Sequence, residues 1–279
     1  MISHTHHSPS ESFWVSSALI LTSIMYLRGR LRLRRHEHDN VEGWRAGSFV
    51  FGLLFIWIAT ASPLAELDHE LLTAHMVQHL LLMTLAPPLI LLGMRRTPLA
   101  HGLSHVVIHP ALCWVASTCT LILWHIPSVF MFGMRSQMWH GVEQASFLVT
   151  GFLFWSPVVR PLQNSLKWPE SSILLYLFLA TLPCDILSGL LVFCDRVVYP
   201  VFLSSPRSIG FSALEDQQCA GALMWTCVTV VYLIAGTVFT ARLLSPHRSP
   251  HGSRELAIPQ FDSRRFAVRH ADPHRMETV

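Results

Sequence analysis

Residues 75–93, HMVQHLLLMTLAPPLILLG, place two histidines four positions apart at the head of an apolar run. The run approaches the length of about 20 residues that a helix needs to cross the hydrocarbon core of a bilayer. A polar side chain that faces lipid is costly, and the pair Pro87-Pro88 removes backbone donors from the helix. The stretch therefore predicts a membrane helix that kinks or breaks at the prolines and turns His75 and His79 toward its neighbours.

Composition extends this prediction to most of the chain. Of the 279 residues, 51% are apolar and only 13% are charged, whereas soluble domains have about 25% charged residues. The apolar residues fall into seven separate runs, which predicts an all-α, polytopic membrane protein, a seven-transmembrane-helix bundle. The runs are Phe13–Leu27, Ala46–Leu64, Leu71–Gly93, Val106–His125, Trp139–Val159, Ser171–Phe193 and Gln218–Phe239.

The basic residues predict the orientation of this bundle. Lys and Arg are retained on the cytoplasmic side during insertion. An outside N-terminus and an inside C-terminus leave 17 of the 20 basic residues in the cytoplasm and only Arg135, Arg196 and Arg207 outside. The net charge of +3 then reflects topology, and we expect no nucleic acid partner.

The chain is predicted to divide after its last apolar run. Residues 1–242 are expected to form the membrane domain. Residues 243–279 are rich in Ser, Pro, His and Arg and lack apolar periodicity, so we expect a mostly disordered, basic cytoplasmic tail. The arginines of the tail favour contact with anionic membrane lipid.

With this topology, the polar residues of the spans gather on the outer side. His75, His79 and Met83 form one stripe along a helix, and His140 shares a face with Glu143. Imidazole is the commonest metal ligand, and thioether sulfur adds selectivity for Cu(I). The pattern predicts a metal site with the ligands His69, His75, His79, Met83, His125 and His140, with His69 at its mouth. Glu143, Asp216, Gln217 and Asp185 are predicted to support the ligands through hydrogen bonds.

The same residues have structural alternatives. Paired histidines can hydrogen-bond between helices, a histidine at a helix end can lie near the headgroups, and Met83 can be core packing. Asp185 follows Pro183 in the sixth run, where we expect the helix to break near Pro183–Gly189 and turn the carboxylate inward, although a backbone hydrogen bond would also satisfy it. Cys194 and Cys219 are compatible with a disulfide or with two free thiols.

Enzyme signatures are absent from the sequence. It contains no Walker loop, no G-x-S-x-G and no H-E-x-x-H, and no C-x-x-C pair of a zinc site. We therefore expect that the protein is not an enzyme.

Four stretches resemble the CtaG family of membrane assembly factors for caa-type cytochrome c oxidase. They are AHMVQHLLLMTLAPPLILLG, LWHIPSVF, WHGVEQASFLVTGFLFWSPVV and EDQQCAGALMW, in the family's order, and the resemblance spans roughly residues 44–240. The chain departs from the family at one position. The family carries a histidine directly after the glutamate of the third stretch, and here Gln144 follows Glu143. This departure removes one imidazole from any metal site at that place.

The resemblance implies a multi-pass protein of the bacterial inner membrane that helps to mature the oxidase. Transient copper binding, with delivery to an oxidase subunit from the outer face, is the expected task. The partners would be cytochrome c oxidase subunits and a periplasmic or extracellular copper donor. Two other functions stay open from the residues alone: a haem-binding electron carrier with paired histidines, and a metal-free scaffold for oxidase subunits.

The predicted topology is testable by cysteine labelling. In a Cys-free variant that carries Ser8→Cys, we expect a membrane-impermeant maleimide to label intact cells, because the N-terminus lies outside. Ser249→Cys, in the tail, is the control and should react only after the cells are permeabilised. Labelling of Ser8→Cys from the cytoplasmic side alone would overturn the topology.

Overall fold

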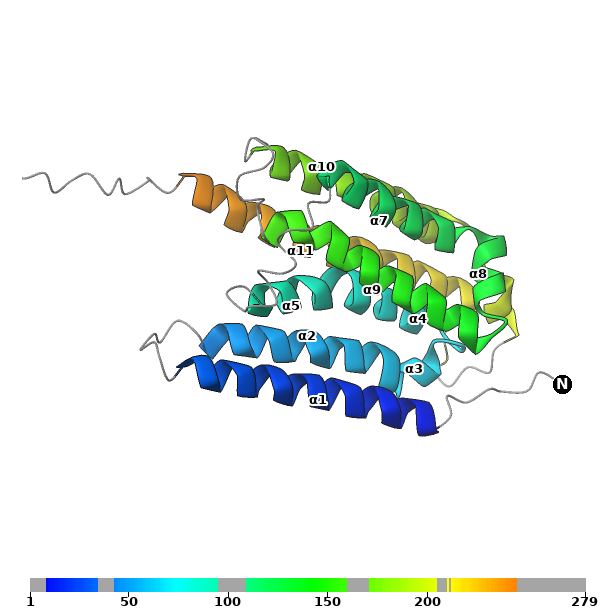
Figure 1. The fold of residues 1–279 in the computed structure, drawn as a ribbon. Coiled ribbons are helices and arrows are strands. Elements are labelled where there is room, and N and C mark those ends of the chain that lie inside the picture. Colours follow the sequence, from blue (N-terminus) through cyan, green and yellow to red (C-terminus); the bar gives the residue numbers. More distant parts are fainter. Residues whose placement is uncertain are drawn as a thin grey trace, which may run out of the picture. The chain divides into compact units, whose positions relative to one another are not determined.

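The computed structural model describes residues 9–34, 43–94, 109–159, 171–204, 210 and 212–244, and every regular element in these ranges is helical (Figure 1). In chain order the elements are α1 (Pro9–Arg34), α2 (Gly43–Ala61), α3 (Leu64–Leu67), α4 (Leu72–His79), the π-helical segment η2 (Leu80–Leu85), α5 (Ala86–Met94), α7 (Pro110–His125), α8 (Pro127–Gly133), α9 (Gln137–Val159), α10 (Ser171–Phe193), the 3₁₀ turn η3 (Pro200–Leu203) and α11 (Ala213–Leu244).

Most of the predicted runs are found as long helices. Within the described ranges, five helical stretches are long and apolar enough to cross a membrane, and α7 with α8 makes a sixth if that bent pair is one span. The first run lies in α1, which is helical over 26 residues but is not among these candidates. The all-α prediction is confirmed for the described residues, and the count of seven spans stays a prediction. The tail from residue 245 onward lies outside the described residues, so the division at residue 242 also stays a prediction.

A sharp bend separates α7 from α8. A residue that precedes a proline is disfavoured in the α conformation, and Ile126 before Pro127 is extended, with φ −67° and ψ 124°. Pro127 then opens α8, since the first turn of a helix does not need the missing amide hydrogen. The two helices differ in direction by 82°. The bend therefore ends α7 at His125.

The third span is a continuous helix with a widened middle. The sequence predicts a kink or break at Pro87-Pro88, and the structure has the π-helical η2 directly before the prolines and no break. Neither proline can donate to the Met83 carbonyl, and the indole N–H of Trp155 on α9 donates to that oxygen at 3.2 Å. A neighbouring helix thus satisfies a freed carbonyl, which allows prolines within a membrane span.

This third span lies at the centre of the bundle. Of the residues in its apolar window, 67% are buried, against 17–44% in the other candidate spans, and α4 and α5 lie between α2 and α9 (Figure 1). The closest approach of α9 is at Gly151, where an added Cβ would lie 2.8 Å from the Met83 carbonyl oxygen and 2.9 Å from the Pro87 ring. Only a residue without a side chain fits this contact.

In α10, too, the helix continues where a break is predicted. Pro183 lies inside the helix, which runs without interruption from Ser171 to Phe193. The prediction of a break near Pro183–Gly189 is wrong, because an interior proline removes one hydrogen bond and leaves the others in place. Asp185 is half-buried on this helix, and its Oδ1 has no hydrogen-bond partner.

A methyl group at position 151 tests the packing of α9 on the third span. Gly151→Ala should lower the melting temperature of the purified protein in detergent, because overpacking costs about 1–3 kcal/mol. Gly141→Ala on the same helix is the matched control, since nothing lies within 4 Å of its added Cβ. Equal melting temperatures for the two variants would contradict the close approach at Gly151.

Candidate metal centre

Five side chains with metal-binding atoms meet near the start of α4. His75 and His79 come from α4, His140 and Glu143 come from the beginning of α9, and Asp68 comes from the turn between α3 and α4. None of the five is more than 6% exposed. We call this set the histidine–carboxylate cluster. The structure thus brings together three of the histidines that the sequence predicts as ligands.

Glu143 occupies the middle of the cluster. Its Oε1 lies 3.4 Å from His75 Nε2 and 3.3 Å from His79 Nε2. Its Oε2 lies 3.5 Å from His140 Nδ1, and the Nε2 atoms of His75 and His79 are 2.7 Å apart. Two ligands of one tetrahedral metal ion lie about 3.3 Å from each other. Glu143, which the sequence predicts only as a support for the rings, is therefore placed as a ligand would be.

Asp68 is the member of the cluster that the sequence analysis missed. Its Oδ2 lies 2.8 Å from His140 Nε2. Burial raises the pKa of the Asp68 carboxyl, but the contact with His140 and the neighbouring imidazoles outweigh burial, so the pKa lies below its ordinary value. Asp68 is therefore ionised at neutral pH. Its only signal in the sequence is an acid next to His69, in a loop whose residues follow no helical period.

The carboxylates of the cluster lack hydrogen-bond partners of good geometry. This holds for both oxygens of Asp68 and both oxygens of Glu143, and all four are buried. The Nδ1 atoms of the three histidines are unpartnered as well. Buried charges need a counter-charge, which a protonated imidazole such as His140, 2.8 Å from Asp68, or a bound cation can supply. Imidazole and carboxylate donors fit a divalent transition-metal ion.

The ligand atoms also lie close enough together to share an ion. One set joins Asp68, His75 and His140, and a second joins His75, His79 and Glu143. Within each set the ligand atoms lie within 4.8 Å of one another. His75 belongs to both sets, so the cluster can hold one ion in either of two neighbouring positions.

Asp216, from the first turn of α11, holds the helix that carries His75 and His79. Its Oδ2 accepts from the Leu72 N–H at 2.7 Å, and its Oδ1 accepts from the N–H and the hydroxyl of Thr73 at 3.1 and 2.6 Å. The sequence analysis placed Asp216 beside a ligating ring. The structure corrects this, because the free amides and the positive dipole end of α4 hold the carboxylate.

The remaining predicted ligands lie outside the cluster. His69 is partly exposed beside it, with its Nε2 3.6 Å from Asp68 Oδ1. His125, at the end of α7, contacts the Leu121 carbonyl through Nδ1 at 2.7 Å and lines a cavity together with Met83. The expected single site of five histidines is thus divided, because the His125 ring turns back along its own helix to that carbonyl.

Gln217 and Asp185 also differ from their expected roles. Gln217 accepts from the Val198 N–H at 2.7 Å and donates to the carbonyls of Leu191 in α10 and Arg196 beyond it, so it fixes the segment that follows this helix. Asp185 is not a member of the cluster. Cys194 and Cys219 are free thiols in the structure.

One comparison with known proteins bears on this geometry. A family model described as cytochrome c oxidase caa3 assembly factor matches residues 24–246, which is most of the chain and includes the whole cluster. The chain belongs to this family. The predicted membership is confirmed, and it assigns the chain a role in the assembly of cytochrome c oxidase. No curated protein and no solved structure gives a significant match.

Gln144 lies where this caa3 assembly factor departs from the family pattern noted above. Its Nε2 lies 2.8 Å from His140 Nε2 and 3.3 Å from Gln78 Oε1. The side chain at position 144 therefore reaches the cluster. A glutamine places an amide beside that ring, whereas a histidine at this position would bring a further imidazole.

Removal of the Asp216 carboxylate tests the support of α4 in the caa3 assembly factor. Asp216→Ala should lower the free energy of unfolding by about 1–2 kcal/mol, because Leu72 and Thr73 lose the acceptor for their amides. Asp195→Ala, an exposed acid in the segment between α10 and α11, is the control. Thermal melts of the two variants should differ. If they coincide, Asp216 is not the cap of α4.

Proposed function

We propose that this assembly factor is not an enzyme and that it binds copper transiently in the histidine–carboxylate cluster before passing it to an oxidase subunit. One observation carries the proposal: three imidazoles and two carboxylates are buried together in two groups whose ligand atoms lie within 4.8 Å of one another, and the oxygens of Glu143 have no hydrogen-bond partner of good geometry. A purely structural network would satisfy such groups by hydrogen bonds. Because the family consists of assembly factors for cytochrome c oxidase, we infer that the oxidase receives the copper.

The charge of the cluster suits a divalent ion. Asp68 and Glu143 together carry two negative charges, which balance those of Cu²⁺ and reduce the cost of taking the ion out of water. Copper also forms the most stable divalent complexes with nitrogen and oxygen ligands. The imidazoles, when neutral, add lone pairs without adding charge.

The position of His69 favours exchange of the metal. His69 is the partly exposed neighbour of the cluster, and its ring centroid lies 5.6 Å from that of His140. A metal can leave a buried site by stepwise replacement of its ligands, and a histidine at the edge is the first such replacement on the way to a partner. The ligands also come from three separate segments, so a small shift of the turn that carries Asp68 opens the set.

The seven-span topology with the N-terminus outside is part of the proposal. Helix α1 has 26 residues and is about 39 Å long, which is enough to cross a bilayer. It packs along the bundle through the Tyr26 hydroxyl, which donates to the Gly93 carbonyl at 2.7 Å, and through the Trp57 indole, which donates to Ser16 at 3.0 Å. The distribution of basic residues then directs the cluster toward the outer face, where a copper donor and the oxidase subunit would meet it.

A haem-binding electron carrier is less consistent with the geometry. The two axial ligands of a haem iron approach from opposite faces of the ring. His75 and His79 lie on one helix with their Nε2 atoms 2.7 Å apart, which leaves no room for an iron between them.

Co-expression with the oxidase tests the copper role. The oxidase matured by a His75→Asn/His79→Asn factor should have a copper-to-haem ratio several-fold below the ratio obtained with the wild type, measured by mass spectrometry on purified oxidase. His109→Asn, an exposed histidine that precedes α7, is the control and should leave the ratio unchanged. An oxidase that is fully loaded with copper by the double variant would show that the pair is structural. Loss of the whole oxidase, with the variant factor present in the membrane, would favour the scaffold function.

A further inference from the structure

A cavity lies beside the histidine–carboxylate cluster, among α4, η2, α7, α9, α10 and α11. Its volume of about 40 Å³ is room for a few water molecules. Most of its wall is apolar, and no carboxylate or basic chain other than histidine lines it. The lining side chains with soft or imidazole donor atoms are Met76, Met83, Met224, Cys184, His79 and His125.

Among the side chains of this wall, His125 is the one whose hydrogen bonding indicates that the cavity binds a ligand. Its Nδ1 contacts the Leu121 carbonyl at 2.7 Å, and because a carbonyl only accepts, the ring proton lies on Nδ1. Its Nε2 therefore carries a free lone pair, and this atom is buried without a hydrogen-bond partner. The residue is 6% exposed. A backbone carbonyl that holds the opposite nitrogen is the usual arrangement of a metal-binding histidine.

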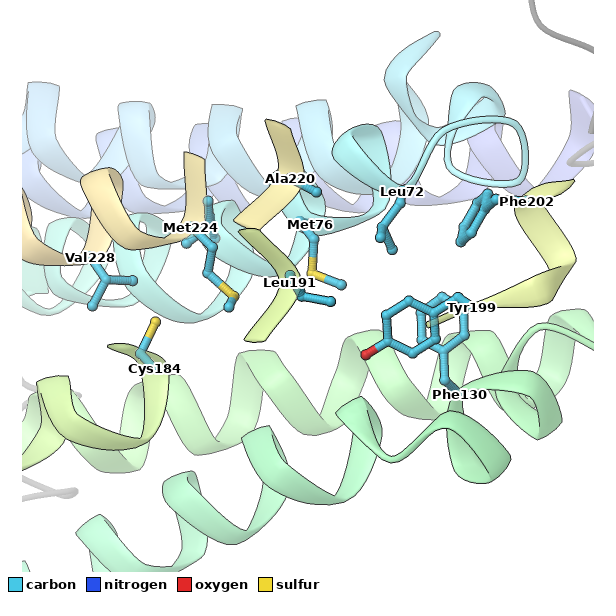
Figure 2. Close-up of a cluster of buried hydrophobic side chains, with 11 residues drawn as sticks. Leu72, Met76, Phe130, Cys184, Leu191, Tyr199, Phe202, Ala220, Met224 and Val228 are labelled. Carbon is cyan, nitrogen blue, oxygen red and sulfur yellow. The ribbon is translucent and has the colours of Figure 1, made fainter. Parts of the chain in front are cut away.

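Sulfur atoms surround the same space. Met76 of α4, Met224 of α11 and Cys184 of α10 belong to one buried cluster, and Figure 2 shows their side chains pointing into the same gap between helices. Met83 of η2 is a fourth sulfur-containing residue that lines the cavity. Thioethers are soft, neutral donors that select Cu(I) and bind divalent ions poorly. A singly charged ion is also the one that a wall without carboxylates admits most readily.

We propose that this cavity is a binding site for Cu(I), held by His125 Nε2 and the thioethers of Met76, Met83 and Met224. His79 lies in both the cavity wall and the histidine–carboxylate cluster, so it links the two sites. The metal enters and leaves as Cu(I), and the site requires no electron transfer. The binding of Cu(I) in the cavity is inferred from the cavity alone. A role of the cavity in copper delivery rests on the proposed function.

Anaerobic titration of the full-length protein in detergent tests the site. Cu(I) binding is measured by competition with bicinchoninate, and Zn²⁺ binding reports on the cluster. Met76→Leu/Met224→Leu keeps the volume of the side chains and should weaken Cu(I) binding roughly ten-fold or more, with Zn²⁺ binding unchanged. Met134→Leu, which packs against the same apolar cluster without lining the cavity, is the matched control and should change neither.

A second variant separates this proposal from the function proposed above. His140→Asn/Glu143→Gln removes cluster ligands and should abolish Zn²⁺ binding while Cu(I) binding persists. Equal Cu(I) affinities for the wild type and Met76→Leu/Met224→Leu would overturn the cavity site and leave the cluster untouched. If the methionine variant loses binding of both Cu(I) and Zn²⁺, its fold is disturbed. X-ray absorption of the Cu(I)-loaded wild type then tests directly whether sulfur atoms bind the copper. Copper without sulfur neighbours in that spectrum would refute the proposal.

Discussion

The carboxylate of Glu143 lies between imidazoles of two helices, and the arrangement of the bundle depends on that contact. A charge inside a membrane bundle must find its partners within the protein, since lipid offers none. His75 and His79 approach Glu143 from α4, so α4 and α9 must keep one relative position. Two other contacts supply this constraint. Asp216 holds the first turn of α4, and Gly151 lets α9 reach the backbone of the same span.

The central span combines two demands that usually conflict. It must carry polar side chains at one end and still bury its backbone throughout the membrane. Pro87 and Pro88 free the Met83 carbonyl, and the Trp155 indole on the neighbouring helix takes it up. The π-helical turn before the prolines changes the faces on which later residues lie, because it adds residues to one turn. Met83 lines the cavity together with His79, four residues earlier, but is not a member of the cluster.

Donor atoms are sorted by chemistry along this span. Carboxylates and imidazoles meet at its start, and thioethers meet beside η2. Hard and borderline donors stabilise divalent ions, whereas soft neutral donors stabilise monovalent copper. His79 stands at the boundary and has access to both groups. A single bundle can in this way offer one environment suited to divalent ions and a neighbouring one suited to Cu(I), without any change in its fold.

Helix content was predictable from the sequence because length, apolarity and helical period are local properties. The predicted runs agree with α2, the third span, α9, α10 and α11 within a few residues, and the family was recognised from four short stretches. The i, i+4 and i, i+3 spacings also identified His75, His79, His140 and Glu143 as residues of shared faces. Tertiary structure alone decided that Asp68 points inward and that Asp216 caps a helix. The physical reason is competition: a buried polar group takes whichever amide, carbonyl or ring comes within reach, and which one does depends on neighbours far away in the chain.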